Sequence, residues 1–234
     1  MNFRPTLLPT LVTVPMLVVL IGLGTWQVHR LQWKQDLIER LQQRTAAEAV
    51  PLPAGPLSRE EMEFRRVRVT GAFDHAHEFY LWNRLRNGRP GLNVLTPLVV
   101  AEGQGTILVN RGWIPVELQD PGTRTAGQVQ GQVTLEGVLR FADRRSSLAK
   151  QNNSEKNIWF SVDPTAMAAV ARLEAMPDHY IEMTDRDVPD GWPIGQEMRV
   201  NLTNNHLQYA VTWYSLAVAL AVIYVVYHRR RREP

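Results

Sequence analysis

Near its carboxyl end the chain carries eighteen residues without a charged side chain, from Ala210 to Tyr227. A helix of that length spans roughly 27 Å at 1.5 Å per residue, which is close to the hydrocarbon thickness of a bilayer. The polar sequence Asn204-Asn205-His206 precedes the run, and His228 followed by Arg229–Arg232 comes after it. We therefore predict a transmembrane helix at 209–227 and a basic tail at 228–234.

A second uncharged stretch, residues 7–25, lies near the amino end and is followed by Trp26, an aromatic residue typical of a membrane interface. It predicts a first transmembrane helix at 7–26, with a kink at Pro15. The alternative is a cleaved signal peptide, with Gly22 and Gly24 before the cut. The charged segment before the run is short, which favours a retained anchor.

Two spans place both termini on one side of the membrane. The arginine tail favours the cytoplasmic side under the positive-inside rule, so we expect the segment between the spans to face the periplasm. No presequence rich in arginine and serine precedes the first span, which favours a bacterial inner membrane over import into an organelle.

Charge and composition exclude several classes of protein. The net charge is +3, but Arg4, Arg229–Arg232 and Glu233 contribute +4, so residues 5–228 carry −1. The clustered basic face of a nucleic-acid-binding protein is therefore not expected. The chain has no cysteine, which excludes disulfides, CxxC redox pairs, iron–sulfur sites, thiolate copper sites and thioether-linked haem.

The region between the spans begins with a helical pattern and continues with strands. Apolar residues at three- and four-residue intervals predict a helical extension at 27–50, which the proline-rich residues 51–56 end. Alternation and turn residues predict strands at 66–70, 78–86, 92–101, 106–113, 133–141, 158–162, 179–184 and 198–202. Gly103-Gln104-Gly105 predicts a hairpin turn, and Asp163-Pro164 predicts the start of a short helix at 165–173.

These elements define the expected fold class. It is a membrane-anchored α+β protein, in which two transmembrane helices flank a mostly antiparallel β domain with one short helix. We place this periplasmic β-rich domain at 57–205.

Two clusters have metal-like compositions, and neither is complete. The sequence Asp74-His75-Ala76-His77-Glu78 would present its histidines on one face if it were a strand. It stands where turn residues are expected, so a solvated turn is the default interpretation. Asp185, Asp187 and Asp190 have the spacing of oxygen ligands but lack the rest of a calcium loop. Nucleophile, phosphate-loop and HExxH motifs are missing, so we do not expect an enzyme.

Two further segments combine tryptophan with arginine. Trp26 and Arg30 follow the first span, and Arg111 precedes Trp113 in a predicted strand. One interpretation is an interfacial aromatic belt for the first pair and strand packing with a stacked arginine for the second. The other is a surface that meets a partner protein or acidic groups.

His206 lies about one turn before the second apolar run. Helical spacing places Ala210, Trp213, Ala217, Ala221 and Tyr224 on the face below it, which predicts a shallow groove with Trp213 as its wall. Such small residues are typical of helix–helix packing, with the histidine at the wet interface. The alternative is an axial histidine above a flat macrocycle that lies half in the membrane.

Several motifs resemble the surfeit locus protein family, in order and over nearly the whole chain. They are Leu23-Gly24-Thr25-Trp26-Gln27-Val28-His29-Arg30-Leu31-Gln32-Trp33-Lys34, Val67–Phe73, Gly91–Pro97, Val109-Asn110-Arg111-Gly112-Trp113-Ile114-Pro115 and Asn204-Asn205-His206-Leu207-Gln208-Tyr209-Ala210. The segments Arg84–Pro90 and Pro121–Gln132 look variable, and nothing is inferred from the family there.

The resemblance implies a chaperone of the respiratory chain, an assembly factor for cytochrome c oxidase. Bacterial members of the family are linked to binding haem a and supplying it to the catalytic subunit. A histidine at the start of the second span is the family's proposed haem ligand, and His206 matches it, so His206 is the one metal ligand we predict. Trp26 matches the tryptophan after the first span. The expected partners are the oxidase catalytic subunit, the haem a synthesis machinery and the lipid bilayer.

Within this hypothesis, Trp213 packs against the ring, and Arg30 and Arg111 pair with haem propionates on grounds of charge alone. Two alternatives remain at this stage. One is a scaffold that binds no haem and stabilises an oxidase assembly intermediate. The other is a periplasmic enzyme, for which no reactive group is found.

Overall fold

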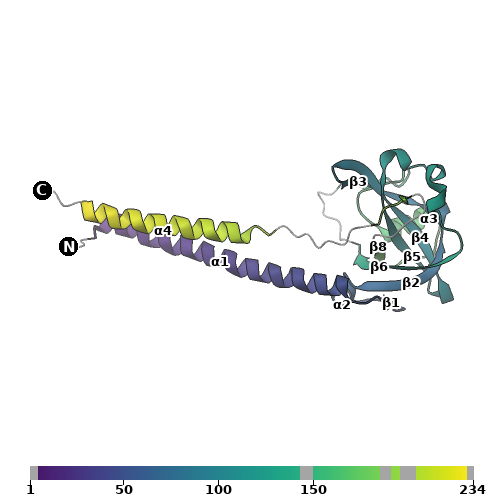
Figure 1. The fold of residues 1–234 in the computed structure, drawn as a ribbon, viewed down its shortest axis with the longest axis horizontal. Helices are drawn as coiled ribbons and strands as arrows, with labels where there is room; N and C mark the ends of the chain where they lie inside the picture. The colour runs from purple at the N-terminus through teal and green to yellow at the C-terminus, as the bar shows by residue number, and fades with distance from the viewer. Residues whose placement is uncertain (1–4, 143–149, 185–190, 196–203, 231–234) are drawn as a thin grey trace. The chain divides into compact units, whose positions relative to one another are not determined.

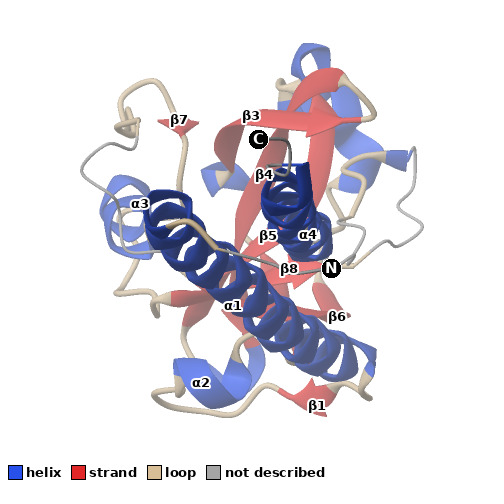
Figure 2. Ribbon diagram, turned by 90° about the vertical axis from the view of Figure 1, so that its left-hand side faces the viewer, coloured by secondary structure: helices blue, strands red, loops and turns tan. Residues whose placement is uncertain are grey.

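The computed structural model describes residues 5–142, 150–184, 191–195 and 204–230. The chain forms two compact units (Figure 1). The helical unit comprises residues 1–41 and 200–234, and the β unit comprises residues 42–199. Helices and strands are distinguished by colour in Figure 2.

The helical unit is a pair of long helices, α4 (His206–Arg230) and all but the last five residues of α1 (Leu7–Ala46). In Figure 1, α4 (yellow) runs beside the amino-terminal part of α1 (purple), and the start of α1 and the end of α4 lie at the same end of the pair. Both helices are long and apolar enough to cross a membrane, judged by length and composition. The prediction of an apolar helix at each terminus is confirmed, and this composition suggests membrane anchoring. α1 includes Pro15 and continues without interruption to Ala46.

The described part of the β unit contains eight strands and two short helices. The strands are β1 (Val50–Pro51), β2 (Arg66–Phe73), β3 (Phe79–Arg86), β4 (Arg89–Val100), β5 (Thr106–Pro115), β6 (Gln132–Phe141), β7 (Ile158–Trp159) and β8 (His179–Met183). The helices are α2 (Arg59–Met62) and α3 (Pro164–Ala171), and 3-10 turns occur at His75–His77, Ala101–Gly103, Val116–Leu118 and Pro121–Gly127.

These strands form one sheet in the order β1-β2-β6-β8-β5-β4-β3-β7, with β2 also pairing with β4. Most pairings are antiparallel, and three, β1 with β2, β3 with β7 and β5 with β8, are parallel. The predicted mostly antiparallel β domain with a short helix is thus confirmed; α3 is that helix, and α2, of four residues, was not predicted. The predicted strand at Met198–Leu202 lies outside the described residues.

Local sequence explains the strand faces and turns. On β2, Val67 and Val69 are buried, while Arg66 and Arg68 on the other face pair with Glu136 of β6 at 2.9 and 2.8 Å. Such alternation is what a sheet with one buried face requires. Between β3 and β4, Asn87 and Gly88 both have positive φ values, 51° and 77°, as expected of a tight Asn-Gly hairpin turn.

Core residues occupy both faces of the sheet. One cluster joins β2, β6 and β8 through side chains that include Val67, Leu139 and Ile181. A second joins Leu108 of β5 to Met167 of α3, and a smaller third joins β3, β4 and β5. α3 begins where predicted, since the Asp163 carboxylate accepts from the Ala166 N–H at 3.1 Å and Pro164 takes the first helical position.

Candidate functional site

His206, at the start of α4, is held by a side chain of α1. His206 Nδ1 lies 2.7 Å from Oε1 of Gln27, which is buried. An amide oxygen can only accept, so Nδ1 carries the ring proton and donates it. A neutral imidazole protonated at Nδ1 has its lone pair on Nε2, the form in which histidine ligates a metal.

The Nε2 atom of His206 has no hydrogen-bond partner among the described residues. Asn204, two residues earlier, has a buried Oδ1 atom that likewise lacks a partner within the described part of the chain. The start of α4 therefore offers one nitrogen lone pair and one amide oxygen for an additional group. The donor set fits a haem iron, because a neutral imidazole is a common axial ligand.

The small-residue face of α4 packs within the helix pair. Ala210 and Ala217 are 2% and 6% exposed. On α1, Gly24 faces the ring of Tyr214, and a Cβ atom placed on it would lie 2.8 Å from that ring. These contacts match the helix-packing interpretation of the alanines. Trp213 is only partly buried.

Three more hydrogen-bonded contacts join α4 to α1 or to Thr6, the residue before α1. Thr25 and Tyr214 hydroxyls lie 3.1 Å apart, and Thr10 and Tyr224 hydroxyls lie 2.6 Å apart. Near the termini, the Thr6 hydroxyl lies 3.0 Å from His228 Nε2. Sequence reasoning missed these pairs. Their signal was the recurrence of threonine and tyrosine within two otherwise aliphatic stretches.

The predicted residues of α1 are accessible. Trp26 is 56% exposed, beside the buried Gln27. The Arg30 guanidinium stacks on Trp33, 3.9 Å from the ring centroid, and belongs to an exposed residue. This cation–π contact leaves the outer edge of the guanidinium open to an acidic group.

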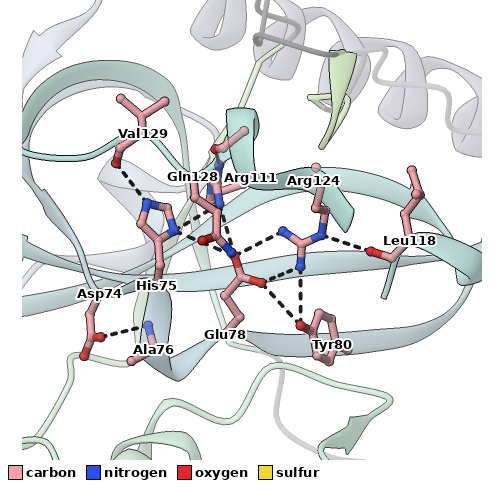
Figure 3. Close-up of polar contacts among 12 residues, drawn as sticks. Asp74, His75, Ala76, Glu78, Tyr80, Arg111, Leu118, Arg124, Gln128 and Val129 are labelled. Carbon is pink, nitrogen blue, oxygen red and sulfur yellow. Dashed lines mark hydrogen bonds and ion pairs between the residues drawn. The ribbon is translucent and has the colours of Figure 1, made fainter. Parts of the chain in front are cut away.

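Arg111 lies in the interior of the β unit, on β5. It is 4% exposed and donates to Glu78 Oε1 at 3.2 Å and to the Gly127 carbonyl. Arg124 donates to the same carboxylate, at 3.2 Å to Oε1 and 2.5 Å to Oε2. Figure 3 shows Glu78 between the two guanidinium groups, with Tyr80 beside Arg124. The guanidinium of Arg111 thus already has an internal carboxylate partner.

The same cluster shifts the pKa values of its members. Burial alone would raise the pKa of Glu78, but hydrogen bonds from His75 and Arg124 and the two arginine charges outweigh it and lower that pKa to about 2. Burial lowers the pKa of Arg111 to about 10, against the opposing attraction of Glu78. Burial and the Glu78 charge together raise the pKa of Tyr80 to about 12.

The expected solvated turn at 74–78 is wrong for two of its residues. The side chains of His75 and Glu78 are 9% and 2% exposed, because Glu78 is the counter-charge for the buried arginines. His75 Nε2 bonds the Val129 carbonyl at 2.9 Å, whereas His77 Nδ1 bonds Asp74 at 2.6 Å. In the described part of the chain, no three His, Asp or Glu side chains are grouped to hold a metal. Asp185, Asp187 and Asp190 lie outside it.

Comparison with known proteins identifies the family. The model of the SURF1 family matches residues 14–218, which include every predicted site residue. The chain belongs to the SURF1 family. Surfeit locus protein 1 of Homo sapiens is 40% identical over 222 residues, covering 88% of this chain and 73% of the human protein. The corresponding protein of Gallus gallus is 39% identical over 217 residues, 86% of this chain and 69% of its own length.

A more distant relative extends the match. A SURF1-like protein of Monosiga brevicollis is 35% identical over 231 residues, covering 94% of this chain and 87% of its own length. The resemblance read from the motifs is therefore confirmed. SURF1 family membership covers both units, because the matched region runs from within α1, through the β unit, into α4.

Proposed function

We propose that this SURF1 family member is an assembly factor for cytochrome c oxidase that binds haem a at a membrane boundary and aids its insertion into the catalytic subunit. Family membership supports the assembly-factor role. The observation that carries the haem part of the proposal is the Gln27–His206 hydrogen bond, which leaves Nε2 of His206 as the free lone pair.

In this proposal, the residues of the helical unit hold and orient the group. Haem a, when bound, supplies an iron that a neutral imidazole can ligate and carboxylates that cations can pair with. His206 would ligate through Nε2, and Gln27 would keep the ring in one orientation. Trp213 and Trp26 would contact the macrocycle, and Arg30 would pair with a propionate. Arg111 is left out of this set, because Glu78 already pairs with its guanidinium.

The proposed location rests on the two apolar helices and on the arginines that follow the second one. The helices would be retained as a multi-pass anchor in a bacterial inner membrane, with both termini cytoplasmic and the β unit periplasmic. The proposed partners are the oxidase catalytic subunit and the machinery that makes haem a. The protein would act without making or breaking covalent bonds.

Haem content tests the proposal. The full chain is purified in detergent from cells that make haem a, and the absorption spectrum and haem-to-protein ratio are measured. We expect haem in the wild type and its loss in His206→Ala. His29→Ala, which changes an exposed histidine of α1, is the matched control and should keep its haem. Full haem content in His206→Ala would overturn the assignment of the ligand.

A scaffold without haem is the second candidate. The burial of Ala210 and Ala217 favours it, because this face of α4 is used for helix packing. A wild type that never carries haem but copurifies with the catalytic subunit, and does so equally well in His206→Ala, would establish this alternative.

A further inference from the structure

A polar cavity of about 350 Å³ opens in the β unit, and we propose that it binds a small hydroxycarboxylate anion. Five strands and the segment 160–162 line it. The polar residues at its wall are Arg84, Asn93, Asn110, Arg140, Ser161, Tyr180 and Glu182. Leu81 and Phe160 supply apolar surface. The inference concerns the β unit alone and does not depend on haem binding.

The cavity interrupts an otherwise apolar face of the sheet. On β5, Leu108 belongs to the core under α3, and Asn110, two residues on, points to the same side. Asn110 pairs in register with Glu182 of β8, and Tyr180 of that strand pairs with Arg140 of β6. Arg140 lies two residues further along β6 than the partner of Glu182, and its side chain reaches Glu182, so polar side chains of three neighbouring strands meet here. Burying such a group of polar side chains is unfavourable unless each finds a partner.

Two irregularities of the sheet lie at this cavity. The β4–β5 register shifts between Val94 and Leu95, next to Asn93. The β3–β4 register shifts between Leu81 and Arg84, where Asn83 has a φ of 59°. Bulges redirect side chains and are common beside binding sites. Here both shifts occur next to residues that line the cavity.

Two polar atoms at the cavity lack partners. Asn93 Oδ1 and Ser161 Oγ are buried and have no hydrogen bond to any described residue. Asn93 is 4% exposed, so its carbonyl oxygen is an acceptor withdrawn from bulk water. Of the seven buried side-chain atoms without a hydrogen bond in the described chain, these two line one cavity. Buried groups of this kind are normally satisfied, which points to an occupant with polar atoms.

The charges at the wall indicate an anion. Arg140 donates to Glu182 at 3.1 Å, and its Nε atom lies 3.6 Å from Glu63 Oε1, so the charge of Arg140 is already compensated by carboxylates. No hydrogen bond or ion pair joins the guanidinium of Arg84 to another described residue, although Arg84 is partly buried. An uncompensated guanidinium favours a carboxylate. The Asn93 oxygen accepts from a hydroxyl, and the Ser161 hydroxyl can donate, so a hydroxycarboxylate satisfies all three groups.

Binding of three probe molecules to the full chain in detergent tests the inference. The probes are malate, succinate and glycerol, measured by calorimetry. We expect malate to bind more tightly than succinate, which lacks the hydroxyl, and glycerol, which lacks a carboxylate, not to bind. Arg84→Gln should weaken malate binding by about tenfold or more, the loss of a charge-assisted pair. Arg89→Gln, an exposed arginine of β4 outside the cavity, should bind as the wild type does.

A second variant separates a binding site from a structural cavity. Asn93→Leu removes the unpartnered oxygen and fills space, so it should raise the melting temperature while abolishing malate binding. Two results would overturn the inference. One is equal malate affinity in Arg84→Gln and the wild type. The other is a wild type that binds neither malate nor succinate at millimolar concentration and shows no bound small molecule by native mass spectrometry, which would indicate a cavity filled by water.

Discussion

Two polar clusters differ in how fully their groups are hydrogen-bonded: the Glu78 cluster of the β unit, with Arg111 and Arg124, and the His206–Gln27 pair of the helical unit. In the β unit, both oxygens of Glu78 receive donors from Arg111 and Arg124. In the helical unit, Gln27 engages only one ring nitrogen of His206. A cluster whose groups are all paired has little capacity for another ligand, so we assign the first to stability. A cluster with a free lone pair can accept a ligand, so we assign the second to binding.

The largest expected effect comes from removing the carboxylate of Glu78, which is the counter-charge of Arg111 and Arg124. Glu78→Gln leaves two buried guanidinium groups without a carboxylate and should lower the free energy of unfolding by about 3–5 kcal/mol. Urea denaturation followed by tryptophan fluorescence measures it, since Trp159 in the core of the β unit is fully buried. Glu136→Gln, which breaks exposed pairs with Arg66 and Arg68, is the control and should cost much less. Equal losses in the two variants would contradict the assignment.

The stabilising contribution of Glu78 should also depend on pH. The pKa of Glu78 falls from its ordinary 4.5 to about 2 in the folded protein. Because the folded pKa lies below the unfolded one, this contribution is fully present above about pH 4.5 and is lost as the pH falls toward 2. The loss is on the order of 3 kcal/mol. Urea midpoints between pH 2 and 6 should therefore fall more steeply for the wild type than for Glu78→Gln, and parallel curves would refute the expectation.

A change in the His206–Gln27 pair should weaken haem binding and have little effect on the free energy of unfolding. Gln27→Ala frees the His206 ring to rotate and to change tautomer, so haem affinity should fall by about 10- to 100-fold. Titration of haem-free protein with haemin, followed by the absorption spectrum, measures it. Gln32→Ala changes an exposed glutamine of the same helix and should bind haemin normally. If Gln27→Ala also binds normally, the hydrogen bond serves only helix packing.

The smallest expected effect concerns the contact between the helices. Gly24→Val introduces a side chain against the ring of Tyr214 and should destabilise the helix pair by about 1–2 kcal/mol. Gly22→Val is the matched control, because nothing lies within 4 Å of a Cβ atom placed there. Unfolding in mixed detergent micelles compares the two variants. Identical curves would show that Gly24 is not needed for close approach.

Much of the fold could be predicted from local patterns. Uncharged runs located α1 and α4, alternation located six of the strands closely, and Asp163-Pro164 located the start of α3. These signals work because side-chain periodicity and capping act over a few residues. The order of strands was not predictable in this way, since the pairing of β8 with β5 and β6 joins segments far apart in the chain.

The site was harder to predict for the same physical reason. The chemistry of His206 depends on Gln27, 179 positions earlier, and no local pattern links the two. Glu78 stands in a segment rich in turn residues, so its burial was missed. Its one signal was the apolar sequence Phe79–Leu81 directly after it. The Asn87-Gly88 turn carried a recognisable dipeptide signal that was not used.

The central place of β8 has a consequence for biosynthesis. β8 is the last described strand along the chain, yet it lies between β6 and β5. Until residue 183 has been synthesised, the edges of β5 and β6 that will receive β8 stay unpaired. At about 5–20 residues per second, that interval after β6 lasts roughly 2–8 s on the ribosome. An mRNA that ends between the codons for residues 141 and 183 would yield a chain in which β5 and β6 each keep an unpaired edge. Unpaired strand edges favour aggregation.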